Sequence, residues 1–352
     1  MRFLAATLTV LLLAGVSAAL AEMTLIEDFE SYEVGSSIHL KGTDAMGGGA
    51  RWHTQVNGAA LMDCNRAFVQ VEDNTKCLRA TTQYWNSENP NIICVAMSMY
   101  DYGIYGEGTI YFAFKHPGDP NGFALQTNDK WPGWDYGGAE TGDVAAPSFQ
   151  GNMGSDGWNQ GGVIAGFAGN TNGAGWFWGR DGSASNPPAA GDAGYKFQQV
   201  NTQSNEWTEF WVQVDHANDR SKFYTCPRGG TPELIMNPDG GEWWAMRNEQ
   251  RDNNAVLNLR FQIGYPWPTQ VVCTLFLDDV AIDNTAMTLD RPDVQHDQPI
   301  PGDLDGDGDV DLDDFVILKN AFGVGDAGDC DDDGDTDLDD FVILKNNFGT
   351  AA

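Results

Sequence analysis

An internal repeat near the C-terminus constrains this chain more than any other feature of its sequence. The ten residues DLDDFVILKN occur at 311–320 and again, unchanged, at 337–346, and DLDGDGD at 303–309 corresponds to DCDDDGD at 329–335. The two copies are 26 residues apart, and an identity of this length does not arise by chance. The last part of the chain therefore consists of two copies of one structural unit.

Each copy begins with the residue spacing of an EF-hand calcium loop. Aspartate stands at loop positions 1, 3, 5, 7, 9 and 12, and glycine (Gly308 or Gly334) stands at position 6, where the chain turns sharply. A hard dication takes six to eight oxygen ligands, and a bound ion makes so many clustered carboxylates tolerable. We therefore expect two calcium ions, bound by Asp303, Asp305, Asp307, Asp309, Asp311 and Asp314 in the first loop and by Asp329, Asp331, Asp333, Asp335, Asp337 and Asp340 in the second.

A short helix is predicted after each loop. Its apolar face is formed by residues at i, i+3 and i+7, and glycine follows at 323 or 349 as a C-terminal cap. The apolar residues are Phe315, Leu318 and Phe322 in the first copy and Phe341, Leu344 and Phe348 in the second. No helix is predicted before the first loop, because 291–302 (RPDVQHDQPIPG) contains three prolines and is typical of a linker.

A loop followed by one helix, twice, with Asp at position 12, resembles the dockerin type I module over 303–350. The segment FVILKNNFG is similar to segments of secreted planctomycete proteins. The resemblance implies a calcium-folded module that docks onto a cohesin domain, as in assemblies that degrade plant polysaccharides. Leu312-Asp313 and Leu338-Asp339 stand at positions 10 and 11, where clostridial dockerins commonly have Ser-Thr. This departure leaves three alternatives open for the partner: a cohesin-like domain, another surface receptor, or no partner at all.

The N-terminus has the pattern of a secretory signal peptide. In residues 1–21, Arg2 precedes a mostly apolar segment, and Ala19-Leu20-Ala21 supplies the small-x-small cleavage pattern before Glu22. We expect cleavage near Ala21 and a secreted, extracellular or cell-surface protein. No later stretch approaches the roughly 20 apolar residues that a membrane span needs.

The charge balance excludes nucleic acid as a partner. The 352 residues include 19 Lys+Arg and 51 Asp+Glu, which gives a net charge of −32. Such a chain has nothing with which to neutralise a phosphate backbone. Half of this charge lies in residues 293–352, which contain 18 aspartates and two lysines.

The region 22–290 is predicted to be mostly β. Residues 106–115, 207–215 and 257–263 alternate apolar and polar side chains, and shorter strands are expected at 65–71, 77–82, 92–99, 162–168, 175–179 and 271–282. This alternation is typical of antiparallel sheets with one covered face, so we predict an antiparallel β-sandwich, or jelly roll, before the linker and the small α-helical calcium-binding module.

The segments TLIEDFESYEVGSSI, GEGTIYFAFK, EWTEFWVQVDHANDRSKFY and VVCTLFLDDVAID resemble secreted concanavalin-like (laminin-G-like) jelly-roll domains. Such domains include carbohydrate-binding modules, adhesion modules and glycan-cleaving enzymes, so this resemblance leaves three classes open. They are a carbohydrate-binding module, a glycoside hydrolase or polysaccharide lyase, and a structural cell-surface protein.

A glycan site is expected on the polar face of strand 207–215. Sugars stack on aromatic rings and bond to amide, carboxylate and guanidinium groups. The candidates are Trp207, Trp211, Gln213, Asp215, Arg260 and Tyr111. No catalytic residue is assigned, because the compact Glu-x-Asp-x-x-Glu run of family-16 glucanases is missing. Glu209 and Asp215 share a strand face but are about 20 Å apart, too far for a catalytic pair. Glu107 remains open as a cross-strand partner.

Two further expectations concern stabilising groups in the large domain. Export makes the six cysteines candidates for disulfides, with Cys64–Cys77 as the preferred pair and Cys94, Cys226 and Cys273 unresolved. Asp278-Asp279 near the last strand and Glu27-Asp28 on the first form a candidate site for one structural calcium ion.

Overall fold

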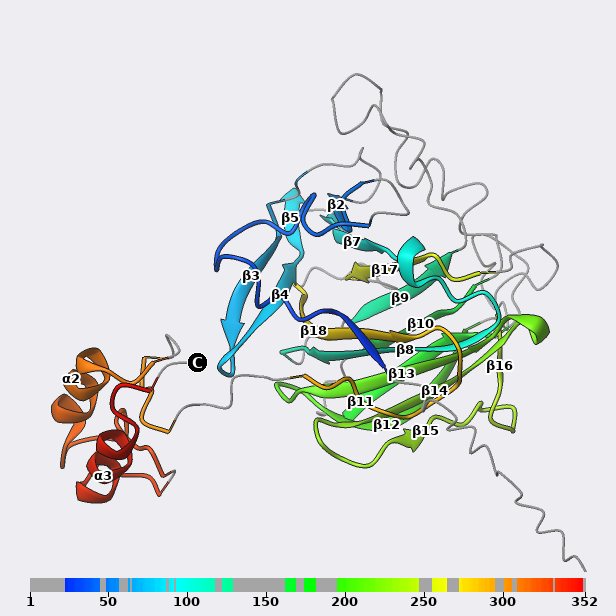
Figure 1. The fold of residues 1–352 in the computed structure, drawn as a ribbon. Coiled ribbons are helices and arrows are strands. Elements are labelled where there is room, and N and C mark those ends of the chain that lie inside the picture. The colour runs from blue at the N-terminus through cyan, green and yellow to red at the C-terminus, as the bar shows by residue number, and fades with distance from the viewer. Residues whose placement is uncertain are drawn as a thin grey trace, which may run out of the picture.

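The computed structural model describes residues 23–44, 49–56, 63, 65–86, 89–91, 93–117, 122–128, 162–168, 174–181, 195–246, 255–264, 272–294, 301–305, 309–331 and 333–350. Within these residues the chain forms two antiparallel sheets and, near its C-terminus, two short helices (Figure 1). This confirms the predicted fold class.

The first sheet contains nine strands in the order β15-β14-β13-β8-β18-β4-β3, with β1 paired to β18 and β16 to β14. The strands are β1 (Thr24–Glu27), β3 (Ala67–Glu72), β4 (Thr75–Thr81), β8 (Glu107–Lys115), β13 (Thr208–Asp215), β14 (Arg220–Pro227), β15 (Glu233–Leu234), β16 (Trp244–Ala245) and β18 (Thr274–Asp283). The first and last strands of the sandwich thus lie side by side.

The second sheet contains seven strands in the order β12-β11-β10-β9-β17-β7-β2. They are β2 (Trp52–Val56), β7 (Ile93–Ser98), β9 (Phe123–Asn128), β10 (Ile164–Ala168), β11 (Ala174–Arg180), β12 (Tyr195–Gln203) and β17 (Asn258–Ile263). A separate pair joins β5 (Gln83–Asn86) to β6 (Asn89–Asn91), and the 3-10 turns η1 (Tyr100–Tyr102) and η3 (His216–Asn218) connect strands.

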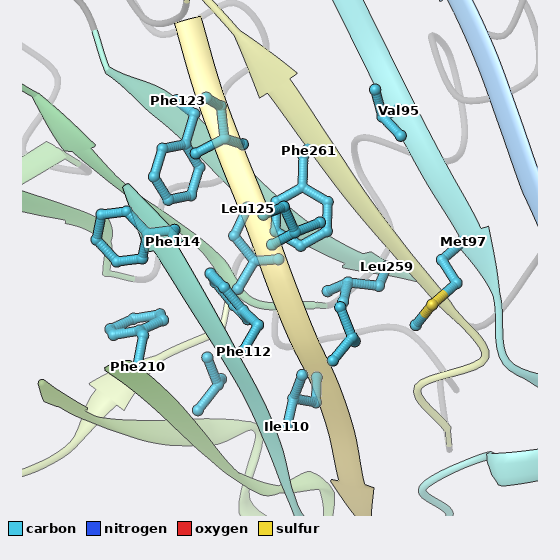
Figure 2. Close-up of a cluster of buried hydrophobic side chains, with 14 of the residues drawn as sticks. Val95, Met97, Ile110, Phe112, Phe114, Phe123, Leu125, Phe210, Leu259 and Phe261 are labelled. Atoms are coloured by element: carbon cyan, nitrogen blue, oxygen red, sulfur yellow. The ribbon is translucent and has the colours of Figure 1, made fainter. Parts of the chain in front are cut away.

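Alternate residues of facing strands build the core between the sheets. Ile110, Phe112 and Phe114 of β8 point inward, and they meet Phe123 and Phe261 of the second sheet. Figure 2 shows these rings directed toward one another. The rings of Phe112 and Phe261 meet edge to face, with their centroids 5.1 Å apart. Burial of this aromatic surface stabilises the sandwich.

The strand predictions with the clearest alternation are confirmed. The predicted strands 106–115, 207–215 and 257–263 correspond to β8, β13 and β17, and the six shorter predictions correspond to β3, β4, β7, β10, β11 and β18. The unpredicted strands β2, β9, β12, β14, β15 and β16, together with β1, complete the two sheets.

The two predicted helices are present as α2 (Leu312–Ala321) and α3 (Leu338–Asn347), orange and red in Figure 1. Their small shared core consists of buried Val310, Leu318 and Leu344, and the rings of Phe315 and Phe341 lie against it with their centroids 6.2 Å apart.

Candidate functional site

Each C-terminal helix begins at an aspartate that caps it. Asp311 precedes α2, and its Oδ1 accepts a hydrogen bond from the Asp313 amide at 2.7 Å. Asp337 caps α3 in the same way through the Asp339 amide at 2.8 Å. A carboxylate here satisfies an amide without an intrahelical partner and lies near the positive end of the helix dipole. The repeated Asp-Leu-Asp-Asp therefore determines where both helices begin.

The last aspartate of the first loop closes that loop on the helix. Asp314 is fully buried, and its Oδ1 accepts hydrogen bonds from the amides of Leu304 at 2.6 Å and Asp305 at 3.1 Å. Its Oδ2 accepts from the Asp311 amide at 2.7 Å. One carboxylate thus holds the beginning of the loop against the beginning of α2, which brings the first and last predicted ligands together.

The second loop repeats this arrangement. Asp340 is 1% exposed and accepts hydrogen bonds from the Cys330 amide at 2.6 Å and the Asp337 amide at 2.7 Å. Burial acts to raise the pKa of Asp340, but the backbone amides that bond to it prevail and hold the pKa below its ordinary value. The carboxylate is therefore ionised at neutral pH and available to a cation.

The described aspartates of the two loops converge in four groups. Within each group, one carboxylate oxygen per residue lies within 4.8 Å of the others. Oxygens bound to one ion at 2.3–2.6 Å are at most about 5 Å apart, so this spacing fits a bound cation. The groups are Asp303, Asp305 and Asp314; Asp309, Asp311 and Asp314; Asp329, Asp331 and Asp333; and Asp335, Asp337 and Asp340. Asp307 lies outside the described residues.

The electrostatics of the loops favour a bound cation. The negative charge of Asp333 raises the pKa of Asp335, and desolvation followed by the charge of Asp333 raises that of Asp331. These carboxylates repel one another, and a cation among them removes the repulsion. Since every group consists of carboxylates alone, the donor set suits a hard cation.

The glycan-binding candidates of the first sheet lie on its outer face, where the chain itself covers them. Residues 286–291, which we call the strap, follow β18 across this face. Trp211 Nε1 donates to the Asp290 carbonyl at 3.0 Å, and Gln213 Nε2 donates to the Thr288 carbonyl at 3.1 Å. The exposed fractions are 8% for Trp207, 0% for Trp211, 7% for Gln213, 1% for Asp215 and 2% for Tyr111. A ring without exposed surface has no face for a sugar, which corrects the expectation for Trp211.

An ion pair fastens the strap. Arg291 Nε lies 2.9 Å from both carboxylate oxygens of Glu209, and its Nη2 lies 2.6 Å from one of them. Glu209 is 3% exposed and also accepts from the Tyr111 hydroxyl at 3.0 Å and the Cys226 thiol at 3.3 Å. Sequence reasoning missed this role, because Arg291 stands at the start of a proline-containing segment and its partner is 82 residues away.

Arg260 does not share a face with the other glycan-binding candidates. It belongs to β17 in the second sheet, whereas β8 and β13 belong to the first. Because Leu259 and Phe261 enter the core between the sheets, Arg260 points to the opposite, outer side of its sheet. The prediction of one continuous platform is therefore wrong. Alternation identifies the polar side of each strand but not the sheet to which the strand belongs.

Asp215, which was a candidate for a carboxylate pair with Glu107, has a structural role. Glu107 is its cross-strand partner. However, Asp215 accepts hydrogen bonds from Arg220 Nε and Asn218 Nδ2, both at 2.8 Å, and these contacts hold its pKa below the ordinary value although burial acts to raise it. Asp215 therefore stays ionised and engaged in these contacts.

The expected calcium site between the first and last strands is not formed. Glu27 accepts from Trp52 Nε1 and the Tyr32 hydroxyl, each at 2.8 Å, so its carboxylate is already hydrogen bonded. Asp278 and Asp279 are buried in a bulge of β18 and form ion pairs with Arg228. In the described part of the chain, the metal-compatible groups all lie in the C-terminal loops.

The cysteines do not support the expected disulfides. None of the five that the structure describes forms a disulfide: Cys77, Cys94, Cys226, Cys273 and Cys330. Cys64, the expected partner of Cys77, lies outside the described residues. Cys77 is buried beside Ala113, Trp207 and Phe276, and burial raises the pKa of its thiol, so it packs as a small apolar residue.

None of the helices in the described part of the chain has the length and apolar character needed to span a bilayer.

No protein-family model and no curated protein matches this sequence. Similar solved structures include the catalytic domain of the glycoside hydrolase family 131 protein from Coprinopsis cinerea, with 9% identity, a TM-score of 0.41 and coverage of 77% of this chain and 98% of that one. Lotus tetragonolobus seed lectin has 9% identity, a TM-score of 0.36 and coverage of 70% and 95%. A sialidase has 9% identity and a TM-score of 0.35, and the match covers 77% of this chain but 19% of the sialidase. Similarity at this level carries no argument about activity.

Proposed function

We propose that residues 303–350 form a dockerin-like module that folds around two calcium ions. The observation that carries this proposal is the duplicated loop, in which eleven predicted ligands gather in two groups per loop and a buried aspartate closes each loop on its helix. Three buried apolar residues cannot offset the ordering entropy of a module of this size. Metal bound only to the folded form would supply the missing stability.

The module also presents the same apolar residues twice on its surface. Leu312 and Leu338, at loop position 10, are 66% and 63% exposed, and Val316 and Val342, one helical turn later, are 49% and 45% exposed. Apolar side chains repeated at these exposed sites are suited to a protein partner. We propose a cohesin-like domain as that partner, or another surface receptor.

Isothermal titration of the full chain tests the calcium part of this proposal. We expect two ions per chain, with weaker binding in Asp303→Asn and in Asp329→Asn. Asp326→Asn is the matched control, because Asp326 carries the same charge outside both loops. Unchanged binding in both loop variants contradicts the assignment.

Docking is tested with a cohesin-type domain in calcium and in EGTA. The doubly substituted Leu312→Asp/Leu338→Asp chain should lose calcium-dependent binding. Val324→Asp is the control, because Val324 is 82% exposed and lies outside the duplicated pair of positions. Equal loss in the control contradicts the proposed surface.

We propose further that the sandwich binds an extracellular glycan at the outer face of its second sheet. The strap covers Trp211 and Gln213 on the outer face of the first sheet, so we place the ligand on the second sheet. Its outer side combines amide and guanidinium groups from Asn258, Arg260 and Gln262. These side chains are 1% exposed, so a glycan would reach them only where this face opens.

A glycan array combined with a reducing-sugar assay tests this second proposal. Binding without product supports a carbohydrate-binding module, whereas product formation supports a glycoside hydrolase or polysaccharide lyase. The absence of both binding and product would support a structural surface protein. Arg260→Met should reduce binding, and Arg79→Met on the first sheet is the control.

We also propose that the chain is secreted, with cleavage near Ala21. Residues 1–21 lie outside the described residues, and the proposal rests on their sequence pattern. N-terminal sequencing of the exported protein should find Glu22 first, and an intact Met1 would contradict the proposal.

A further inference from the structure

Each metal loop is hydrogen bonded to the end of the other repeat's helix. In the first loop, the Gly349 amide donates to the Val310 carbonyl at 2.7 Å, and the Val310 amide donates to the Thr350 carbonyl at 2.9 Å. Gly349 and Thr350 follow α3 of the second repeat. In the second loop, the Thr336 carbonyl accepts from the amide of Gly323, which follows α2, at 2.8 Å. Val310 and Thr336 both occupy loop position 8, so each loop is bonded at the same position to the residues that follow the opposite helix.

The entrance of each loop also packs on the other repeat's helix. A Cβ atom added at Gly302, directly before the first loop, would lie 2.7 Å from the Leu344 Cα in α3. A Cβ atom at Gly328, directly before the second loop, would lie 2.7 Å from the Leu318 Cα in α2. Real Cβ atoms do not approach this closely, so both contacts require glycine. Each loop is thus held at its entrance and at position 8 by the helix of the opposite repeat.

We propose that the two ions bind as a coupled pair, because each loop is completed by the opposite helix. This inference rests on the proposed calcium binding and describes the regulation of that site. An ion in the second loop orders α3, which begins in that loop, and the far end of α3 then holds Val310 in the first loop. The reverse path runs from the first loop through α2 to Thr336. Occupancy of one loop therefore raises the affinity of the other.

A truncation after Phe348 separates this proposal from independent repeats. It removes Gly349 and Thr350 but none of the predicted ligands. With independent repeats, the cut would weaken the second loop, because it removes the residues that follow the C-terminus of that loop's own helix. With interleaved repeats, the first loop loses two backbone hydrogen bonds and should bind calcium about tenfold more weakly or worse.

The measurement is a calcium titration of the full chain with glycine-selective 15N labelling, starting from EGTA. Gly308 and Gly334 occupy position 6 of the first and second loops, so their amide signals report each loop separately. In the unaltered chain, both signals should change over the same calcium range. In the truncated chain, the midpoint for Gly308 should rise at least as much as that for Gly334. A rise confined to Gly334 would overturn the proposal.

A second variant keeps the test decisive if the truncated module does not fold. In Gly328→Ala, the new Cβ atom would press on α2 of the first repeat, and no ligand changes. The midpoints of both Gly308 and Gly334 should rise. Gly325→Ala is the matched control, because a Cβ atom there would meet no atom within 4 Å.

The outcomes distinguish this inference from the proposed function. If neither reporter signal responds to calcium, calcium binding is wrong and the coupling falls with it. If the two signals respond with separate midpoints and Gly328→Ala moves only that of Gly334, calcium binding stands and the coupling is wrong.

Discussion

Replacing Arg291 by methionine removes the charge that neutralises the buried Glu209. Methionine keeps aliphatic bulk near Trp211, over whose ring centroid the guanidinium carbon lies at 5.4 Å, so the change mainly removes an ion pair. Glu209, which is 3% exposed, then keeps the Tyr111 hydroxyl and the Cys226 thiol as side-chain donors. Removing one partner of a buried pair costs about 3–5 kcal/mol. The Arg291 side chain is 37% exposed, and solvent screening lowers the expected loss to about 2–3 kcal/mol.

Urea unfolding followed by tryptophan fluorescence measures this loss. The control is Lys222→Met, which breaks the pair with Glu242, whose side chain is 52% exposed, and should cost at most about 1 kcal/mol. In a thermal scan, Arg291→Met should lower Tm by about 5–10 °C. Adding Glu209→Gln to Arg291→Met should recover part of the stability, because no buried charge is then left unpaired. Equal losses in Arg291→Met and Lys222→Met would refute the reasoning.

Two further predictions concern the sandwich. Trp211→Ala should destabilise it by about 3–5 kcal/mol, because the fully buried ring packs beneath the strap, and urea unfolding equal to that of the unaltered protein would contradict this. Burial lowers the pKa of His53 to about 3 and the pKa values of His116 and His216 to about 4, below the unfolded value of about 6.5, so the unfolded state takes up protons first as the pH falls. Stability should therefore drop by about 2 kcal/mol per imidazole between pH 7 and pH 5. Asp278, whose pKa burial raises, partly offsets this loss, and equal unfolding free energies at pH 7 and pH 5 would contradict the prediction.

Local spacing carried the predictions that the structure supports. The six aspartates of each loop lie within twelve consecutive residues, and the capping aspartate is part of the same segment, so the sequence alone predicts a convergent carboxylate group. The alternation in 106–115 and 207–215 likewise identifies β8 and β13, because a strand with one covered face shows a period of two in its own residues.

Contacts between segments that are distant in the sequence cannot be predicted from local residue spacing. Alternation predicts that the polar side of β13 faces solvent, yet the strap, more than 70 residues later in the chain, covers Trp211. Arg260 was assigned to the face of Trp211, although the two strands pair into different sheets. The hydrogen bond between Val310 and Thr350 joins the two repeats, and the sequence of either repeat alone does not predict it.

The most direct test of the account is the folding of residues 303–350 with and without calcium. Amide NMR spectra of the full chain should show dispersed signals for α2 and α3 in calcium. In excess EGTA these signals should collapse toward unfolded positions and return on adding calcium, while the signals of the sandwich stay dispersed. If α2 and α3 keep their dispersed signals in excess EGTA, the account of a metal-dependent module is wrong.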